Sequence, residues 1–386
     1  MESELKNENL VIDIIDDIDI TTPIYFPCLL CCSLISCCCI STRDISSAIC
    51  CRCCFPPPRP TWNHKFEIAT SVVRNIIRTL PKKKGSISVI RAVGDGGIPY
   101  WSPLLPFGVR SSRGKSLNKV SLPAYEIVYP KSDGLPNLWH SIEDLTAISQ
   151  TPQKTLNRKF ILYFHGGGFI MGGRGSHRMV SHDLCKSTGA TVILIEYKRA
   201  PEFKHPVAEI ECFESYKWLI QRVDSSNIIL AGDSAGGALV VNVLSLIKEN
   251  QISYPRGAVL LSPWVDWFDF TSDSMKSNVC FDYIEPLAAK LTSKLYIETP
   301  VNYHSPTNKD FVGFPPILVE YGECEILHDQ IKAFIDKATA AGVNVQSNCY
   351  PDMVHVFQVF NLTGMLACKQ SYENINKFVT NLYEIV

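Results

Sequence analysis

The chain has almost no excess of either charge. It carries 37 basic and 38 acidic residues in a total of 386, which gives a net charge of −1. A protein that holds a nucleic acid by its phosphates needs a basic face, so we expect no nucleic acid partner. Apolar residues make up 46% of the chain and aromatic residues 10%, enough for a full hydrophobic core.

Cysteine is scarce outside one short segment. Ten of the 16 cysteines lie between residues 28 and 54, and the other six are scattered singly. This distribution does not indicate a disulfide framework for the whole chain. We interpret the six single cysteines as small, buried apolar residues.

The first 22 residues lack the basic region with which a cleaved secretory signal peptide begins, and are acidic instead. An uncharged stretch over residues 21–42 is just long enough to cross a thin bilayer and predicts a membrane anchor. Attachment through acylated cysteines and a cytosolic metal-binding tail are the alternatives. The predicted organisation is an acidic tail (1–20), a cysteine-rich anchor with a proline-rich linker (21–59) and a catalytic domain (60–386).

The membrane face on which the catalytic domain lies is left open by two conflicting signals. Arg43, Arg52 and Arg59 follow the apolar stretch, and the positive-inside rule would then place the domain in the cytosol. The sequon that begins at Asn361 is usable only in the lumen.

Short apolar runs alternate with helical patterns from about residue 120 onward. The runs include KFILYF, TVILIEY, NIILAG, GAVLLSPW and ILVEYGE. Continuous apolar strands separated by amphipathic helices predict an α/β fold with a mostly parallel sheet covered on both faces. Helical sequence within residues 60–118 and 267–312 is interpreted as a cap over the strand ends, with ordinary surface helices as the alternative.

Residues 232–236 read GDSAG and fit the elbow G-x-S-x-G, in which a tight strand-to-helix turn exposes a nucleophilic serine. The run NIILA before it is typical of a buried strand, and the run ALVVNVLSLIKEN after it of a helix. Ser234 is therefore the predicted nucleophile. A serine hydroxyl is a poor nucleophile by itself, so a histidine must accept its proton and an acid must orient that histidine.

The base is predicted to be His355, because in this elbow arrangement the acid and the histidine follow the serine in the chain. Only His304, His328 and His355 lie after Ser234, and only His355 follows the last predicted strand. Its alternative role is that of a hydrogen-bonded structural imidazole.

The acid is predicted to be Glu325, which lies in the loop that follows ILVEYG. Asp329 is the alternative, although its position suggests an N-terminal cap for the helix DQIKAFIDKATAAG. Glu323 is a third carboxylate in the same loop.

The run HGGGF after the strand KFILYF indicates an oxyanion hole, because glycines let main-chain N–H groups approach a developing negative charge. Gly166 and Gly167, with Ala235 after the nucleophile, are the predicted donors. The run has neither G-x-G-x-x-G spacing nor a following Gly-Lys-Ser/Thr, so it does not predict a phosphate site. No cofactor and no metal are expected.

Together these motifs resemble the hormone-sensitive lipase-like branch of the α/β-hydrolases over roughly residues 120–386. The resemblance is carried by HGGGF (165–169), YKRAPE (197–202), GDSAGG (232–237), SPWVD (262–266) and His355. Two departures are Glu325, where the family usually has Asp, and YKRAPE, where it usually has YRLAPE. The second motif looks like support for the oxyanion loop.

The resemblance implies a carboxylic ester hydrolase (serine esterase or lipase) that acts without a cofactor on apolar or lipid-like esters, short-acyl and steryl acetate esters among them. Arylacetamide deacetylases and fungal steryl acetyl hydrolases are similar in having N-terminal anchors, which implies a location at the endoplasmic reticulum membrane. An aryl-amide deacetylase with the same triad and a non-catalytic receptor for a small ligand are the alternatives. The receptors of this family have lost the histidine that this chain keeps at His355.

Overall fold

The structure is a computed structural model that describes residues 59–79, 87, 91, 95, 109–114, 123–130, 159–298 and 305–384. The predicted tail, the anchor and nearly all of the linker lie outside these residues. Within the described ranges, no helix has both the length and the apolar composition needed to span a bilayer.

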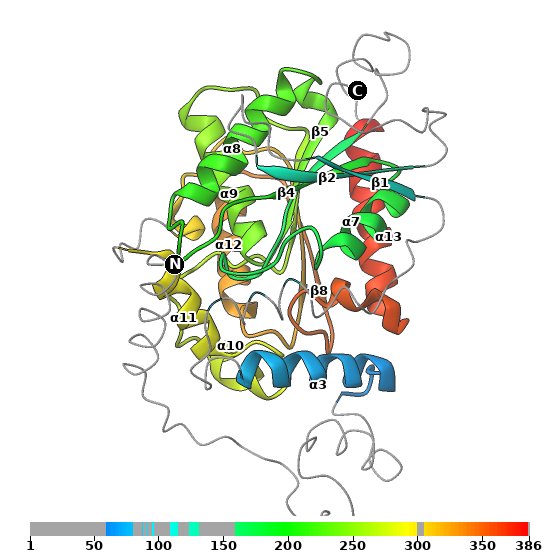
Figure 1. The fold of residues 1–386 in the computed structure, drawn as a ribbon, viewed down its shortest axis with the longest axis vertical. Helices are drawn as coiled ribbons and strands as arrows, with labels where there is room; N and C mark the ends of the chain where they lie inside the picture. Colours follow the sequence, from blue (N-terminus) through cyan, green and yellow to red (C-terminus); the bar gives the residue numbers. More distant parts are fainter. Residues whose placement is uncertain are drawn as a thin grey trace, which may run out of the picture.

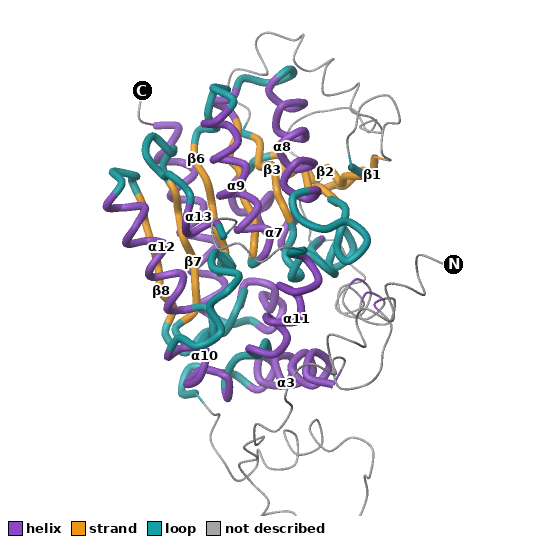
Figure 2. The backbone as a smooth tube through the Cα atoms, turned by 90° about the vertical axis from the view of Figure 1, so that its left-hand side faces the viewer, coloured by secondary structure: helices purple, strands orange, loops and turns teal. Residues whose placement is uncertain are grey.

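A twisted sheet of eight strands forms the centre of the described domain, in the order β1-β2-β4-β3-β5-β6-β7-β8 (Figures 1 and 2). Strands β3 to β8 are parallel, whereas β1 and β2 add an antiparallel edge that the sequence patterns did not predict. The strands are β1 (Val109–Gly114), β2 (Ala124–Pro130), β3 (Phe160–Phe164), β4 (Thr191–Glu196), β5 (Ile228–Asp233), β6 (Gly257–Leu261), β7 (Ile317–Gly322) and β8 (Val345–Tyr350). The prediction of an α/β hydrolase sheet is confirmed.

Helices cover both faces of the sheet because the strands are apolar on both faces. In β3, Leu162 and Phe164 belong to one core cluster, whereas Ile161 and Tyr163 belong to the other. Figure 1 shows one group of helices on one face of the sheet and a second group on the opposite face. The former are α7 (Arg178–Thr188) and α13 (Leu366–Glu384), and the latter are α8 (Val207–Ile220), α9 (Ala235–Glu249) and α12 (His328–Ala340).

A further group of helices lies at one end of the sheet in both views (Figures 1 and 2). They are α3 (His64–Thr79), α10 (Asp273–Ser277) and α11 (Pro286–Tyr296). β7 ends at this end of the sheet. The N–H of Ser274 in α10 donates to Asp329, which follows the last residue of β7, Gly322, by only seven residues. The described helices of the predicted cap segments therefore lie over the carboxyl ends of the strands, whereas β1, which also falls within residues 60–118, lies at the antiparallel edge of the sheet. That these helices act as a lid stays a prediction.

Candidate active site

Ser234 occupies a strained turn between β5 and α9. Its φ of 51° is positive, a conformation that a residue with a side chain rarely adopts. A Cβ on Gly232 would lie 2.4 Å from the carbonyl oxygen of Gly236, and one on Gly236 would lie 1.9 Å from that of Phe164. The turn therefore requires glycine on both sides of the serine. The Ser234 side chain makes no capping bond to α9 and is half-buried among fully buried neighbours, so its hydroxyl is available for chemistry.

Glu325 and His355 form a buried pair on the loops that follow the neighbouring strands β7 and β8. Nδ1 of His355 lies 2.9 Å from Oε2 of Glu325. The other carboxylate oxygen of Glu325 accepts the N–H of Gly322 at 2.6 Å and the hydroxyl of Ser262 at 3.1 Å. With Nδ1–H donating to the carboxylate, the imidazole presents Nε2 as its basic nitrogen.

Burial of His355 lowers the pKa of its imidazole, but the hydrogen bond and the charge of Glu325 raise it by more. The buried carboxylates of Asp282 and Asp233 act in the same direction, so the pKa lies above the ordinary value of 6.5. The N–H of Ser234 donates to the carbonyl oxygen of Leu261 at 2.8 Å, and the next residue, Ser262, accepts the N–H of Val356 at 3.0 Å, so the end of β6 links the elbow to the histidine loop.

The alternative acid Asp329 and its neighbour His328, at the start of α12, are not brought into this pair. Asp329 accepts the N–H of Ser274 in the first turn of α10 at 2.8 Å and lies 3.0 Å from Nδ1 of His328. The expectation that Asp329 caps its own helix was wrong: α12 begins after Leu327 without a side-chain cap, and Asp329 caps α10 instead.

The prediction that Gly166 donates to the oxyanion is contradicted by the structure. Its N–H points at the buried carboxylate of Asp233, with 2.9 Å between Gly166 N and Asp233 Oδ1. A Cβ on Gly166 would also lie 2.2 Å from the other oxygen of Asp233, so the glycine serves close packing. Among the described residues, no hydrogen bond engages the N–H of Gly167, Gly168 or Ala235, which leaves these donors free.

Asp233 is the centre of a buried network that supports the oxyanion loop from beneath. Tyr163 donates its hydroxyl to Oδ1 of Asp233 at 2.6 Å, and Nε2 of His177 lies 3.2 Å from Oδ2. Burial raises the pKa of Asp233 but the charge and hydrogen bond of His177 outweigh it, so the carboxyl pKa is lowered and that of His177 is raised. Both shifts favour the charged forms, an Asp233 carboxylate beside a His177 imidazolium. Sequence reasoning missed this role although Asp233 stands inside the elbow motif.

Ser262 is a second residue whose function the sequence reasoning missed. Its hydroxyl donates to Glu325 and accepts the N–H of Val356 at 3.0 Å, so it joins the acid loop to the histidine loop. Its φ of 45° is positive, as at Ser234. The available signal was its position directly after β6, at the same sheet edge as the other functional groups.

The motif YKRAPE contacts the oxyanion loop, in line with the supporting role inferred for it. The hydroxyl of Tyr197 donates to the carbonyl oxygen of His165 at 2.7 Å, and the two rings stack with centroids 4.2 Å apart. Arg91 donates to both oxygens of Glu202 and, at 2.8 Å, to the carbonyl oxygen of Ile170. A residue of the predicted cap segment thus fastens the motif to the loop.

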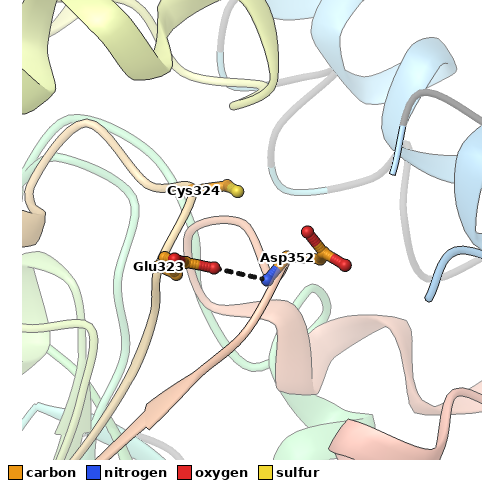
Figure 3. Close-up of side chains that lie close together, drawn as sticks. All are labelled: Glu323, Cys324 and Asp352. Atoms are coloured by element: carbon orange, nitrogen blue, oxygen red, sulfur yellow. Dashed lines mark hydrogen bonds between the residues drawn. The ribbon is translucent and has the colours of Figure 1, made fainter. Parts of the chain in front are cut away.

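Among the described residues, only Glu323, Cys324 and Asp352 form a group whose ligand atoms would suit a metal, all within 4.8 Å of one another. Figure 3 shows the carboxylate of Asp352 turned away from Glu323, whose own carboxylate accepts the N–H of Asp352. Asp352 faces Arg59 at 3.4 Å and accepts the hydroxyl of Thr61 at 3.1 Å. The group therefore ties the two site loops to the segment before α3.

A family model described as the alpha/beta hydrolase fold matches residues 161–359. An esterase of Acinetobacter venetianus is 34% identical over 232 residues, which cover 58% of this chain and 75% of the relative. An acetyl-hydrolase of Streptomyces hygroscopicus is 30% identical over 205 residues, 52% of this chain and 69% of the relative.

Solved structures agree with the sequence relatives. An esterase from the bacterial hormone-sensitive lipase family superposes with a TM-score of 0.68 at 27% identity, covering 81% of this chain and 97% of the other. A hormone-sensitive lipase from a metagenome library gives 0.68 at 26% identity, covering 82% and 98%. The similarity thus extends over nearly the whole of each neighbour.

Proposed function

Because the chain belongs to the α/β-hydrolase fold family, in its hormone-sensitive lipase-like branch, and is a carboxylic ester hydrolase, we propose that Ser234 is its nucleophile. His355 is the base and Glu325 the acid that orients it. The observation that carries this assignment is the buried Glu325–His355 pair on the loops of two neighbouring strands beside the serine elbow.

In the proposed reaction, Oγ of Ser234 attacks the ester carbonyl carbon while Nε2 of His355 accepts the hydroxyl proton. Glu325 stabilises the imidazolium, which then returns the proton to the departing alkoxide. Water, activated by His355, attacks the acyl-enzyme and releases the acid. The tetrahedral oxyanion accepts hydrogen bonds from the N–H groups of Gly167, Gly168 and Ala235.

We propose that the substrates are apolar esters with a short acyl group, steryl acetates among them. The residue after the glycines, Phe169, is fully buried and stacks on Tyr296 of α11 at 3.9 Å between centroids. It also lies 5.4 Å from Trp267 and 5.8 Å from Trp264, so an aromatic cluster adjoins the oxyanion loop. The relatives include an acetyl-hydrolase and an ethyl acetate hydrolase, which supports a small acyl group.

The test is the mass of the intact protein after incubation with a fluorophosphonate, for wild type and Ser234→Ala. We expect one adduct that is absent from the variant, with turnover of p-nitrophenyl butyrate lost in parallel. An adduct that persists in Ser234→Ala would overturn the nucleophile. Turnover of a steryl acetate and an aryl acetamide by the same wild-type sample then separates an esterase from an amide deacetylase.

We also propose that residues 21–42 attach the protein to the endoplasmic reticulum membrane with the catalytic domain in the cytosol. The side-chain nitrogen of Asn361, which a glycan would occupy, donates instead to Asp183 at 2.9 Å, and this supports the cytosolic side. Deleting residues 1–56 is expected to release the protein from a membrane fraction. A truncated protein that still sediments with membranes would contradict the anchor.

A further inference from the structure

The proposed reaction requires two separate loops to hold the acid and the base in register. Glu325 follows β7, His355 follows β8, and their side chains meet through a single hydrogen bond. A misplacement of about 1 Å at such a contact lowers a rate by about 100-fold. Whatever joins the main chains of the two loops therefore contributes to the rate of the reaction.

Asp282 joins them. Its Oδ2 accepts the main-chain N–H of Ile326, the residue after the acid, at 2.8 Å. Its Oδ1 accepts the main-chain N–H of His355 at 3.2 Å and that of Tyr283 at 2.8 Å. Both oxygens of one side chain thus bind the two loops directly at the acid and the base.

The side chain of Asp282 is held rigidly because it is fully buried and its own backbone is anchored. It lies in the predicted cap, between α10 and α11, and is 0% exposed. Arg74 of α3 donates to the carbonyl oxygen of Asp282 at 3.1 Å and also to that of Phe281. Asn278 of the same segment donates to the carbonyl oxygens of Glu323 and Glu325, each at 3.0 Å.

We propose that Asp282 is a positioning residue for ester hydrolysis, which fixes His355 relative to Glu325 and supplies a second negative charge beside the imidazole. The proposal rests on the proposed roles of Ser234, His355 and Glu325. It adds to these three residues a carboxylate that binds the main chain of the two loops and not the imidazole ring of His355.

The negative charge of Asp282 affects the pKa of His355, which a carboxylate farther from the imidazole would not do. The charged groups that face His355 are Glu325, Asp282 and Asp233, with Tyr283 also packed against its ring. Asp282 itself faces His355, Glu325 and Arg74, and burial raises the pKa of its carboxyl to about 6, so it carries its negative charge at neutral pH. Since Asp282 helps to raise the pKa of His355, its neutralisation lowers that pKa and extends activity to lower pH.

The experiment compares full-length wild type, Asp282→Asn and Asp273→Asn. Asp273 is the matched control, because it lies in the same cap region but its side chain is 99% exposed and lies 3.9 Å from that of Lys276. For each protein, kcat and KM for p-nitrophenyl butyrate are measured across the acidic and neutral pH range. The rate of fluorophosphonate labelling and the midpoint of thermal unfolding are measured on the same samples.

We expect Asp282→Asn to lower kcat by about 10- to 100-fold with KM little changed, to slow labelling equally, and to move the acidic limb of the profile to lower pH. Asp273→Asn keeps wild-type values. The proposal is overturned if Asp282→Asn has the wild-type kcat, or if the acidic limb of its pH profile lies at the same pH as in wild type. If the proposed function itself fails, wild type gives no adduct at Ser234, so the two failures are distinguishable.

A second variant covers the case in which Asp282→Asn does not fold. Arg74→Met leaves the carboxylate intact but removes the donor that holds the main chain of Phe281 and Asp282. We expect kcat to fall about tenfold with KM unchanged. A wild-type kcat in this variant would overturn the link from α3 through Asp282 to the site.

Discussion

The pairs Glu325–His355 and Asp233–His177 are both buried, and each joins one imidazole nitrogen to one carboxylate oxygen beside the serine elbow. They differ in what the second nitrogen does. Nδ1 of His177 lies 2.9 Å from the hydroxyl of Ser176, so both of its nitrogens are engaged. Within the described part of the chain, no hydrogen bond engages Nε2 of His355.

The difference teaches that a buried histidine–carboxylate pair is not by itself a sign of catalysis. A base needs one nitrogen held and the other free to exchange a proton with the substrate. In the His177 pair the carboxylate is also bound by Tyr163 and Gly166, so its charge serves to fix the oxyanion loop. One pair is thus suited to proton transfer and the other to support.

The largest effect is expected from the same substitution made in each pair. His355→Gln removes the proposed base, so kcat should fall by about 10⁶-fold; because it also leaves Glu325 buried without its partner, stability should fall too. His177→Gln leaves Asp233 buried without its counter-charge and should cost about 3 kcal/mol of stability, while the folded protein keeps most of its activity. Thermal unfolding and kcat measured on both variants check the contrast, and a reversed pattern would exchange the two roles.

The next effect separates the two candidate acids. Glu325→Gln keeps the shape of the side chain but removes the charge that stabilises the imidazolium, and kcat should fall by about 10⁴-fold. Asp329→Asn alters only the contacts with α10 and His328, so kcat should stay near the wild-type value. Steady-state turnover at saturating substrate is the measurement. A greater loss in Asp329→Asn would move the acid to that residue.

The smallest expected effect is on the pH dependence of kcat/KM in the wild-type protein. Only the neutral imidazole of His355 accepts a proton, and its pKa is raised above 6.5. The raised pKa keeps the inactive imidazolium populated to higher pH, so kcat/KM should fall with decreasing pH through a limb that lies above 6.5. A limb below that value would mean that burial, and not the carboxylates, dominates at His355.

The sequence predicted those parts of the site that local patterns determine. Ser234 lies between a buried strand and a helix in a motif whose glycines have one steric explanation. His355 and Glu325 lie after strands that end at the same sheet edge. The central parallel strands followed from their apolar runs.

The remaining features depend on contacts between segments that no local pattern relates. The use of Gly166 was mispredicted because its N–H is taken by Asp233, 67 residues away. Asp329 caps α10 across 55 residues, so its position before α12 was misleading. The role of Asp282 was not predicted, since nothing in the neighbouring sequence reveals that it binds the main-chain N–H groups of Ile326 and His355.

The contacts of α3 and of Trp62, just before it, form only when the last part of the chain has been synthesised. The indole N–H of Trp62 donates to the carbonyl oxygen of Asp352 across 290 residues, and Arg74 reaches Asp282 across 208. At about 5–20 residues per second, a ribosome needs on the order of 15–60 s to make the chain between Trp62 and Asp352. Until then Trp62 and Phe66 lack their partners near His355, and the nascent protein exposes apolar side chains before it can cleave an ester.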